Sequence, residues 1–177
     1  MVTIYFYVDS SGLERIQKFG LKLSDNFSYT IPINGLEKRV FVGLLNPKDD
    51  LLKFNSNAFT CLKVYLYPEQ CYVINEVSLI IKQKEYNIIP LKEYNFGTFE
   101  SPRVIFNTSI LPEQIEVLNK DIDEPTLFDN SKDLFYQMKI QDMLEKYDLQ
   151  DIYYALCEYL DYKQEDKNKT NDKNSIY

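Results

Sequence analysis

The sequence predicts an α+β fold in which the strands come first and the helices come last. Up to about residue 120, short runs of β-branched and aromatic residues alternate with turn residues, and after Pro125 apolar residues recur at helical spacing. A chain of 177 residues fits one domain. We expect a single globular domain over residues 1–162, mainly β over 1–120 and helical over 121–162. The polar segment 163–177 is predicted to be a disordered tail.

The beginning of the chain predicts a strand and then a short helix. Residues 2–8 form a β-branched and aromatic run without a helical period. Ser11 and Glu14 have the spacing of a capping box, with Ser11 as the N-cap. Gly20 is a typical C-terminal stop for the helix that follows.

The middle of the chain predicts a series of strands separated by turns. Residues 60–67 alternate between apolar and more polar positions, with Leu62, Val64 and Leu66 on one face. The turn at 68–70 allows residues 71–74 to return antiparallel to them. Further strands are predicted at 27–32, 39–45, 77–81, 87–89 and 104–107.

Two helices are predicted near the end of the globular part. Ser131 is the expected cap of the first. The second begins near Leu149 and carries an apolar stripe made of Ile152, Tyr153, Leu156, Tyr159 and Leu160.

The composition excludes several kinds of chemistry. The chain has no histidine, so Ser-His-Asp and Cys-His catalysis and His-ligated zinc are absent. It has five glycines and no glycine-rich phosphate-binding motif. Asp49 and Asp50, which follow Asn46-Pro47, are typical of a turn and helix cap. Cys61 is typical of a small buried thiol. No metal site is predicted.

The charge and the cysteines indicate where the protein works. The first residues have neither the basic start nor the long apolar run of a secretory leader, and no segment reaches the ~18 apolar residues of a membrane span. Three widely spaced cysteines are typical of reduced thiols in the cytoplasm. Residues 121–162 hold 11 acidic and 3 basic side chains, a net charge of −8, which is unfavourable for direct nucleic-acid binding.

Three parts of the chain resemble ADP-ribosyltransferase-fold proteins, chiefly the DNA-modifying toxins of that fold and the RNA 2′-phosphotransferases. Residues 5–9 and 12–21 are similar to the first strand and short helix of that family. Residues 40–49 are similar to the second core strand and its loop, and residues 101–115 to the late strand. The resemblance implies a split antiparallel β core with NAD as the cofactor.

The resemblance also implies a set of site residues, several of which differ from the family pattern. Tyr7 stands where the family has a histidine that contacts the NAD ribose, with Tyr5 and Asp9 beside it as further cofactor-binding candidates. Arg103 stands where the family has its catalytic glutamate, which places a cation where the developing oxocarbenium ion requires an anion. Glu100 is the nearby carboxylate that could replace that glutamate, so the candidate catalytic positions are Tyr7, Glu100 and Arg103.

Three hypotheses about function follow. The first is a binding or inhibitory module on a degenerate transferase fold, without a cofactor, that acts on a protein partner from a host or a phage-defence system. The second is an active NAD-dependent mono-ADP-ribosyltransferase that uses Tyr7 and Glu100. The third is an acidic mimic of a nucleic acid. The candidate partner-binding residues are Asp142, Glu145, Asp148 and Asp151.

Overall fold

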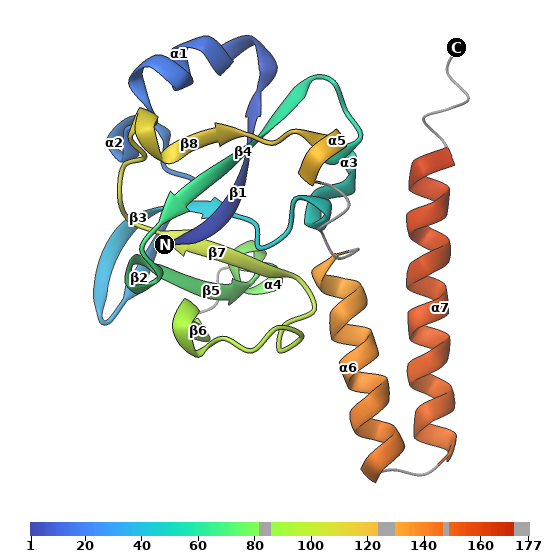
Figure 1. Ribbon diagram of the computed structural model, residues 1–177. Coiled ribbons are helices and arrows are strands. Elements are labelled where there is room, and N and C mark those ends of the chain that lie inside the picture. The colour runs from blue at the N-terminus through green and yellow to red at the C-terminus, as the bar shows by residue number, and fades with distance from the viewer. Residues whose placement is uncertain (82–85, 124–129, 147–148, 172–177) are drawn as a thin grey trace.

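The chain folds into two antiparallel sheets with a long helical hairpin beside them (Figure 1). The computed structural model describes residues 1–81, 86–123, 130–146 and 149–171. The strands are β1 (Val2–Asp9), β2 (Tyr29–Ile33), β3 (Leu36–Gly43), β4 (Phe59–Leu66), β5 (Cys71–Asn75), β6 (Ile88–Pro90), β7 (Pro102–Phe106) and β8 (Ile115–Val117). The helices are α1 (Leu13–Phe19), α2 (Leu23–Asn26), α3 (Leu51–Phe54), α4 (Glu76–Ile80), α5 (Lys120–Asp123), α6 (Ser131–Lys146) and α7 (Leu149–Asn171). The predicted α+β class is confirmed.

The smaller sheet has the strand order β1-β4-β8. Strands β1 and β4 pair along their whole length, from Val2 opposite Leu66 to Asp9 opposite Phe59. The predicted alternation of β4 is confirmed, because Leu62, Val64 and Leu66 are all fully buried. They belong to the main hydrophobic core between the two sheets.

The larger sheet has the order β2-β3-β7-β5-β6, and β5 is where the structure differs most from the predicted topology. Residues 71–74 do not return along β4. Instead β5 lies between β6 and β7, with Val73 opposite Val104. Val73 and its neighbour Ile74 point to opposite faces and are both fully buried. A strand with two buried faces requires an interior position, which the edge of the smaller sheet does not offer.

The two sheets are joined where β1 approaches the end of β3. Tyr5 and Leu44 exchange two backbone hydrogen bonds, of 3.0 and 2.8 Å. Gly43 permits this approach, since a Cβ atom there would lie 2.6 Å from Ile4 Cγ2 and 3.1 Å from the Tyr5 carbonyl oxygen. The ring of Phe41 contacts that of Phe106 on the neighbouring strand, with 5.4 Å between the centroids.

Two local predictions are wrong. Ser11 does not cap α1. A 3-10 turn precedes the helix, and the Asp9 carboxylate accepts hydrogen bonds from the Ser11 backbone and hydroxyl at 3.0 and 2.7 Å. Residues 77–81 do not form a strand, because the chain enters α4 directly after β5, where the Glu76 backbone donates to the Ser101 carbonyl at 2.8 Å. The C-terminal stop of α1 at Gly20 is confirmed, with φ +68°.

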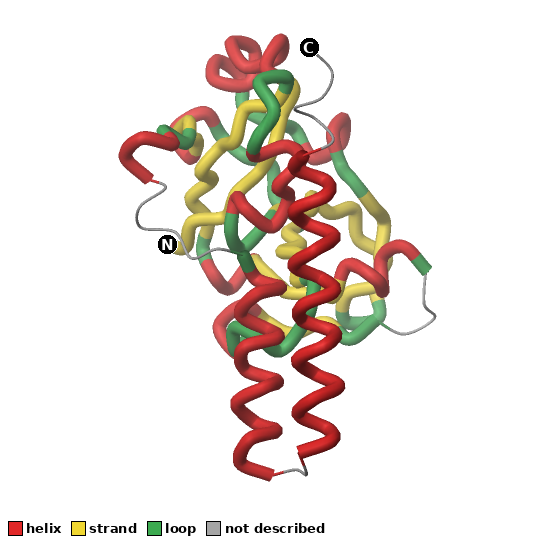
Figure 2. Tube along the Cα trace, turned by 90° about the vertical axis from the view of Figure 1, so that its right-hand side faces the viewer, coloured by secondary structure: helices red, strands yellow, loops and turns green. Residues whose placement is uncertain are grey.

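Helices α6 and α7 form an antiparallel hairpin that lies along one side of the sheets and extends past them (Figures 1 and 2). Helix α7 continues to Asn171, whereas the sequence predicted a disordered tail from residue 163. Two contacts hold the helix at this point: Tyr162 is buried, and Lys163 pairs with Asp133 of α6 at 2.6 Å. Residues 172–177 of the predicted tail lie outside the described residues.

The search for membrane spans, made over the described residues, found no helix with the length and apolarity that a crossing requires.

We expect Gly43→Ala to lower the free energy of unfolding by about 1–3 kcal/mol, because the new methyl group would push β1 away from β3. Chemical denaturation measures this change. The matched control is Gly12→Ala, where the nearest atom to the new Cβ is 3.9 Å away and φ is negative. Equal stability of the two variants would contradict a tight junction at Gly43.

Candidate functional site

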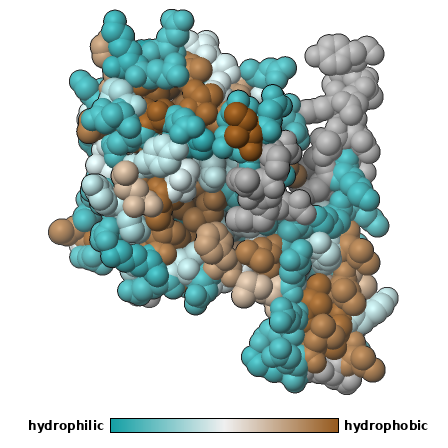
Figure 3. Space-filling model, viewed as in Figure 1, coloured by the Kyte–Doolittle hydropathy of each residue, from teal (hydrophilic) through white to brown (hydrophobic). Residues whose placement is uncertain are grey.

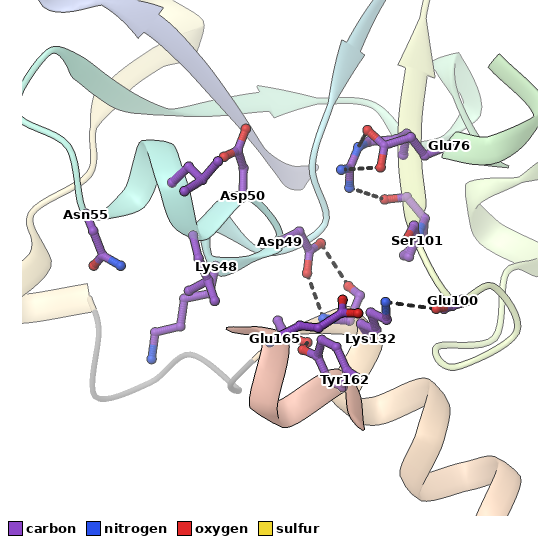
Figure 4. Close-up of a pocket in the computed structure, with 16 residues that line it drawn as sticks. Lys48, Asp49, Asp50, Asn55, Glu76, Glu100, Ser101, Lys132, Tyr162 and Glu165 are labelled. Atoms are coloured by element: carbon purple, nitrogen blue, oxygen red, sulfur yellow. Dashed lines mark hydrogen bonds and ion pairs between the residues drawn. The ribbon is translucent and has the colours of Figure 1, made fainter. Parts of the chain in front are cut away.

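A cleft of about 580 Å³ lies where the loop after β3 and the start of β7 meet the base of the hairpin (Figure 4). Three segments supply most of its lining: residues 48–52 after β3, residues 100–103 at the start of β7, and residues 130–132 at the start of α6. Glu76 of α4 completes one wall, and Tyr162 and Glu165 of α7 complete another.

The loop after β3 forms the floor of the cleft, and its own sequence fixes its shape. Asn46 is fully buried and its side chain accepts a hydrogen bond from the Lys48 backbone at 2.8 Å. The Asp49 carboxylate reaches back to the Asn46 backbone at 3.2 Å, which completes a capping box around Pro47. The predicted turn and cap are therefore confirmed, and they point Asp49 toward the hairpin.

Asp49 joins this loop to the first turn of α6. Its Oδ1 accepts from the Ser131 backbone at 2.6 Å, and its Oδ2 accepts from the Ser131 hydroxyl at 2.8 Å (Figure 4). A carboxylate at a helix N-terminus satisfies backbone donors that have no partner within the helix. Burial raises the pKa of Asp49, and the hydrogen bonds from Ser131 oppose that rise. The hairpin is thus attached to the sheets through a hydrogen-bonded and largely dehydrated carboxyl group.

Arg103 and Glu76 form a two-point ion pair at one wall of the cleft. The guanidinium donates to the two carboxylate oxygens from Nε at 3.1 Å and from Nη2 at 2.8 Å. Its Nη1 donates to the Pro102 carbonyl at 3.2 Å. The Arg103 side chain is only 13% exposed, so the pair is held in one geometry with little water around the cation.

Glu100 belongs to a second group of contacts, at the base of the hairpin. Its carboxylate pairs with Lys132 at 2.9 Å and accepts from the Tyr136 hydroxyl at 3.4 Å. Burial and the nearby Glu100 carboxylate raise the pKa of Tyr136 to about 12, so this phenol stays protonated at neutral pH. Lys132 also lies over the ring of Tyr162, at 4.5 Å from its centroid.

The start of α6 and the middle of α7 are held together by buried polar groups. Asn130 Oδ1 accepts from the Asp133 backbone at 2.7 Å and from the Tyr162 hydroxyl at 3.1 Å. The ring of Tyr162 stacks on that of Tyr136, with centroids 5.6 Å apart. These contacts fix the part of α7 that faces the cleft.

The structure brings two of the three candidate catalytic residues into this cleft. Glu100 and Arg103 line it, whereas Tyr7 lies behind its floor and donates to the Pro47 carbonyl at 2.9 Å. Burial raises the pKa of the Tyr7 phenol, which keeps it protonated in this contact. Tyr5 packs beside Tyr7 against the cluster under α3, and the exposed Asp9 caps the turn before α1. Tyr5 and Asp9 are therefore not among the lining residues.

Three of the four candidate partner-binding acids lie in the described residues, and none of the three lines the cleft. Asp142 pairs with Lys146 one turn along α6, and Glu145 is exposed. Asp151 lines a separate shallow groove between the two helices. Asp148 lies outside the described residues.

Sequence reasoning missed the residues that the hairpin contributes to the cleft. Ser131 was expected only as a cap, and nothing in the sequence connected it to Asp49, 82 residues earlier. Tyr162 was assigned to the helical part without a role. The two signals that existed were the acidic pair after Asn46-Pro47 and the predicted cap at Ser131, and only the fold places them in contact. The capping side chain is that of Asn130, one residue before the predicted one, because its Oδ1 accepts from the Asp133 backbone.

Cys61 does not have the environment of a nucleophile. It lies on β4, buried in a cluster with Phe54 and Leu118, and burial raises the pKa of its thiol to about 12. Within the described residues, no group of three or more acidic or cysteine side chains is arranged to hold a metal ion.

Comparison of the chain with models of protein families, with curated proteins and with solved structures gave no significant match.

We expect Asp49→Ala to destabilise the protein by about 2–3 kcal/mol, because it leaves buried donors at the start of α6 without an acceptor. Ser131→Ala should cost about 1 kcal/mol, and the double variant should show a coupling energy of about 1 kcal/mol. Amide hydrogen exchange should rise first in α6. The control is Asp50→Ala, which removes a cap from α3 but no contact to the hairpin. Additive effects of Asp49→Ala and Ser131→Ala would contradict the link.

Proposed function

We propose that this protein is a binding module on a degenerate ADP-ribosyltransferase-like fold, and that its cleft receives a basic segment of a protein partner. The split between two antiparallel sheets, the short helix after β1 and the position of β7 beside β3 support the fold part of this proposal. The three free cysteines support the cytoplasm as its location.

The observation that carries the proposal is that the candidate catalytic side chains already make contacts within the chain. Each is already held by a partner within the chain: Tyr7 by the Pro47 carbonyl, Arg103 by Glu76, and Glu100 by Lys132. Transfer through an oxocarbenium-like transition state requires an anion placed at the developing positive charge. In this chain Arg103 occupies the position that the resemblance assigns to that anion, and the nearby Glu100 is paired with Lys132, which favours binding over transfer.

The charge of the cleft indicates the kind of partner. Its lining holds five carboxylates (Asp49, Asp50, Glu76, Glu100 and Glu165) and three cations (Lys48, Arg103 and Lys132). The excess of carboxylates attracts a basic group, and the half-exposed Glu100 and exposed Glu165 are accessible to it. Leu51 and Leu52 add an apolar wall that the hydrocarbon part of an arginine or lysine side chain can cover.

An active NAD-dependent transferase is the second candidate. It is favoured by one observation, the position of the Glu100 carboxylate in the cleft just before β7, with its side chain 40% exposed. If a substrate displaced Lys132, this carboxylate would be the anion that the transition state requires.

The nucleic-acid mimic receives less support. Several acids of the helical part are already paired with lysines of the same chain: Asp123 with Lys63, Asp133 with Lys163, and Glu158 with Lys139. Such pairs reduce the negative field that a basic groove would sense.

Incubation with NAD separates the first two functions. We expect no release of nicotinamide above background from the wild-type protein, because Glu100 is neutralised and Arg103 occupies the neighbouring position. Glu100→Gln should behave identically. Release by the wild-type protein that disappears in Glu100→Gln would replace the binding module with the transferase.

A fluorescent hexa-arginine peptide probes the cleft directly. We expect salt-sensitive binding by the wild-type protein, weakened about two- to fivefold for each of Glu100→Gln and Glu165→Gln, since each removes a partly exposed charge. The control pair is Glu14→Gln and Glu37→Gln, which removes two exposed carboxylates away from the cleft. An equal loss of affinity in the control pair would show that net charge, and not the cleft, attracts the peptide.

A further inference from the structure

Two ion pairs hold lysines at the base of the hairpin, and they differ in burial. Lys163 of α7 pairs with Asp133 at 2.6 Å, and the Asp133 side chain is only 4% exposed. Lys132 of α6 pairs with Glu100 at 2.9 Å, and these side chains are 33% and 40% exposed. A partly exposed pair contributes little to stability and is exchanged easily for another partner. Of these two lysines, Lys132 is therefore the one that a ligand of the cleft can displace.

Lys132 occupies a place that has the features of a cation-binding site. Its ammonium lies 4.5 Å from the centroid of the Tyr162 ring and pairs with the Glu100 carboxylate (Figure 4). The Tyr162 hydroxyl donates to Asn130, and its ring stacks on that of Tyr136. The Tyr136 hydroxyl in turn donates to Glu100 at 3.4 Å. The carboxylate and the ring are thus both held by contacts that do not involve Lys132.

The geometry at Glu100 suits a guanidinium better than the ammonium that it now holds. Lys132 and Tyr136 both contact Oε1 of this carboxylate, at 2.9 and 3.4 Å. A guanidinium can donate to both carboxylate oxygens through two parallel hydrogen bonds, whereas a lysine ammonium acts as a point charge. Guanidinium groups also stack on aromatic rings such as that of Tyr162. An arginine that reaches Glu100 therefore gains contacts that Lys132 does not make.

The part of the hairpin beside the cleft is polar. On the face drawn in Figure 3, hydrophobic side chains gather along the protruding half of the hairpin, and hydrophilic ones lie along the part of α7 beside the sheets. The residues that follow Tyr162 in the chain are Lys163, Gln164 and Glu165. Glu165 is exposed and lines the cleft, so it adds a second carboxylate near the same ligand. These surroundings favour a charged ligand over an apolar one.

We propose that Glu100 and Tyr162 form an arginine subsite, and that Lys132 occupies this subsite in the free protein until the guanidinium of a partner displaces it. The inference rests on the proposed function, because it names the residue type that the basic segment must carry and the contact that regulates its entry. A ligand that must first displace Lys132 binds less tightly than the open subsite allows. The chain's own lysine is therefore an internal competitor of its partner.

Two peptides of equal charge test the ligand class. The wild-type protein should bind hexa-arginine about three- to fivefold more tightly than hexa-lysine, because only a guanidinium makes the paired hydrogen bonds to Glu100. Glu100→Gln should bind the two peptides with equal affinity. The control pair Glu14→Gln and Glu37→Gln removes exposed carboxylates away from the cleft and should keep the preference. A preference for hexa-arginine that persists in Glu100→Gln overturns the arginine subsite.

Two lysines of the cleft give a matched test of the displacement. Lys132→Met should bind hexa-arginine about five- to tenfold more tightly than the wild-type protein, since no ion pair or cation–π contact must be broken first. Lys48→Met removes the same charge from the lining of the same cleft and should change the affinity less than about twofold. In the Glu100→Gln background, Lys132→Met should gain no more than Lys48→Met does. Circular dichroism should show equal helix content in each variant, because both lysine side chains are partly exposed.

The outcomes distinguish this inference from the proposed function. Binding by the wild-type protein with equal effects of Lys132→Met and Lys48→Met overturns the internal competitor and leaves the basic-segment proposal intact. A lack of binding by both the wild-type protein and Lys132→Met overturns the two proposals together. Binding by Lys132→Met alone, lost again on Glu100→Gln, supports the subsite and shows that Lys132 keeps it closed.

Discussion

The contact between Asp49 and Ser131 is the constraint on which the rest of the arrangement depends. It satisfies the first backbone donor of α6 and buries a carboxylate that the loop after β3 has already oriented. The hairpin is therefore fixed to the sheets at its base by hydrogen bonds. The cleft exists because of this link, since one of its walls is the sheet side and the other is the base of the hairpin.

Within the cleft, opposite charges are arranged in pairs before any ligand arrives. The Arg103–Glu76 pair has a fixed two-point geometry, and the Glu100–Lys132 pair is more exposed and more easily rearranged. A charged ligand gains affinity mainly where it replaces the weaker of these pairs. A charged ligand is therefore expected to bind at the Glu100 side of the cleft, next to Tyr162. Arg103 keeps its fixed pair with Glu76.

Helix α7 connects two surfaces of the molecule. Its middle section reaches the cleft through Tyr162 and Glu165. Its first half has exposed apolar side chains, namely Leu149, Tyr153, Leu156 and Leu160. The polar composition from residue 163 onward indicated disorder, yet Lys, Glu and Gln are good helix formers. Low apolar content shows that a segment contributes little to a core. It does not show that the segment is unfolded when its preceding turn is fixed, as it is here by Tyr162 and Lys163.

The sequence by itself determined the local features whose causes are local. The alternation of β4, the glycine stop after α1 and the capped turn at Asn46 all depend on residues a few positions apart, and all are present in the structure. Only the tertiary structure decided which strand β5 joins and which helix Asp49 caps, because those partners are distant in the chain and many pairings satisfy the same pattern. For the candidate site, the sequence identified Glu100 and Arg103 but not Lys132, Ser131 and Tyr162. A cleft assembled from separate segments leaves no periodic signal in any one of them.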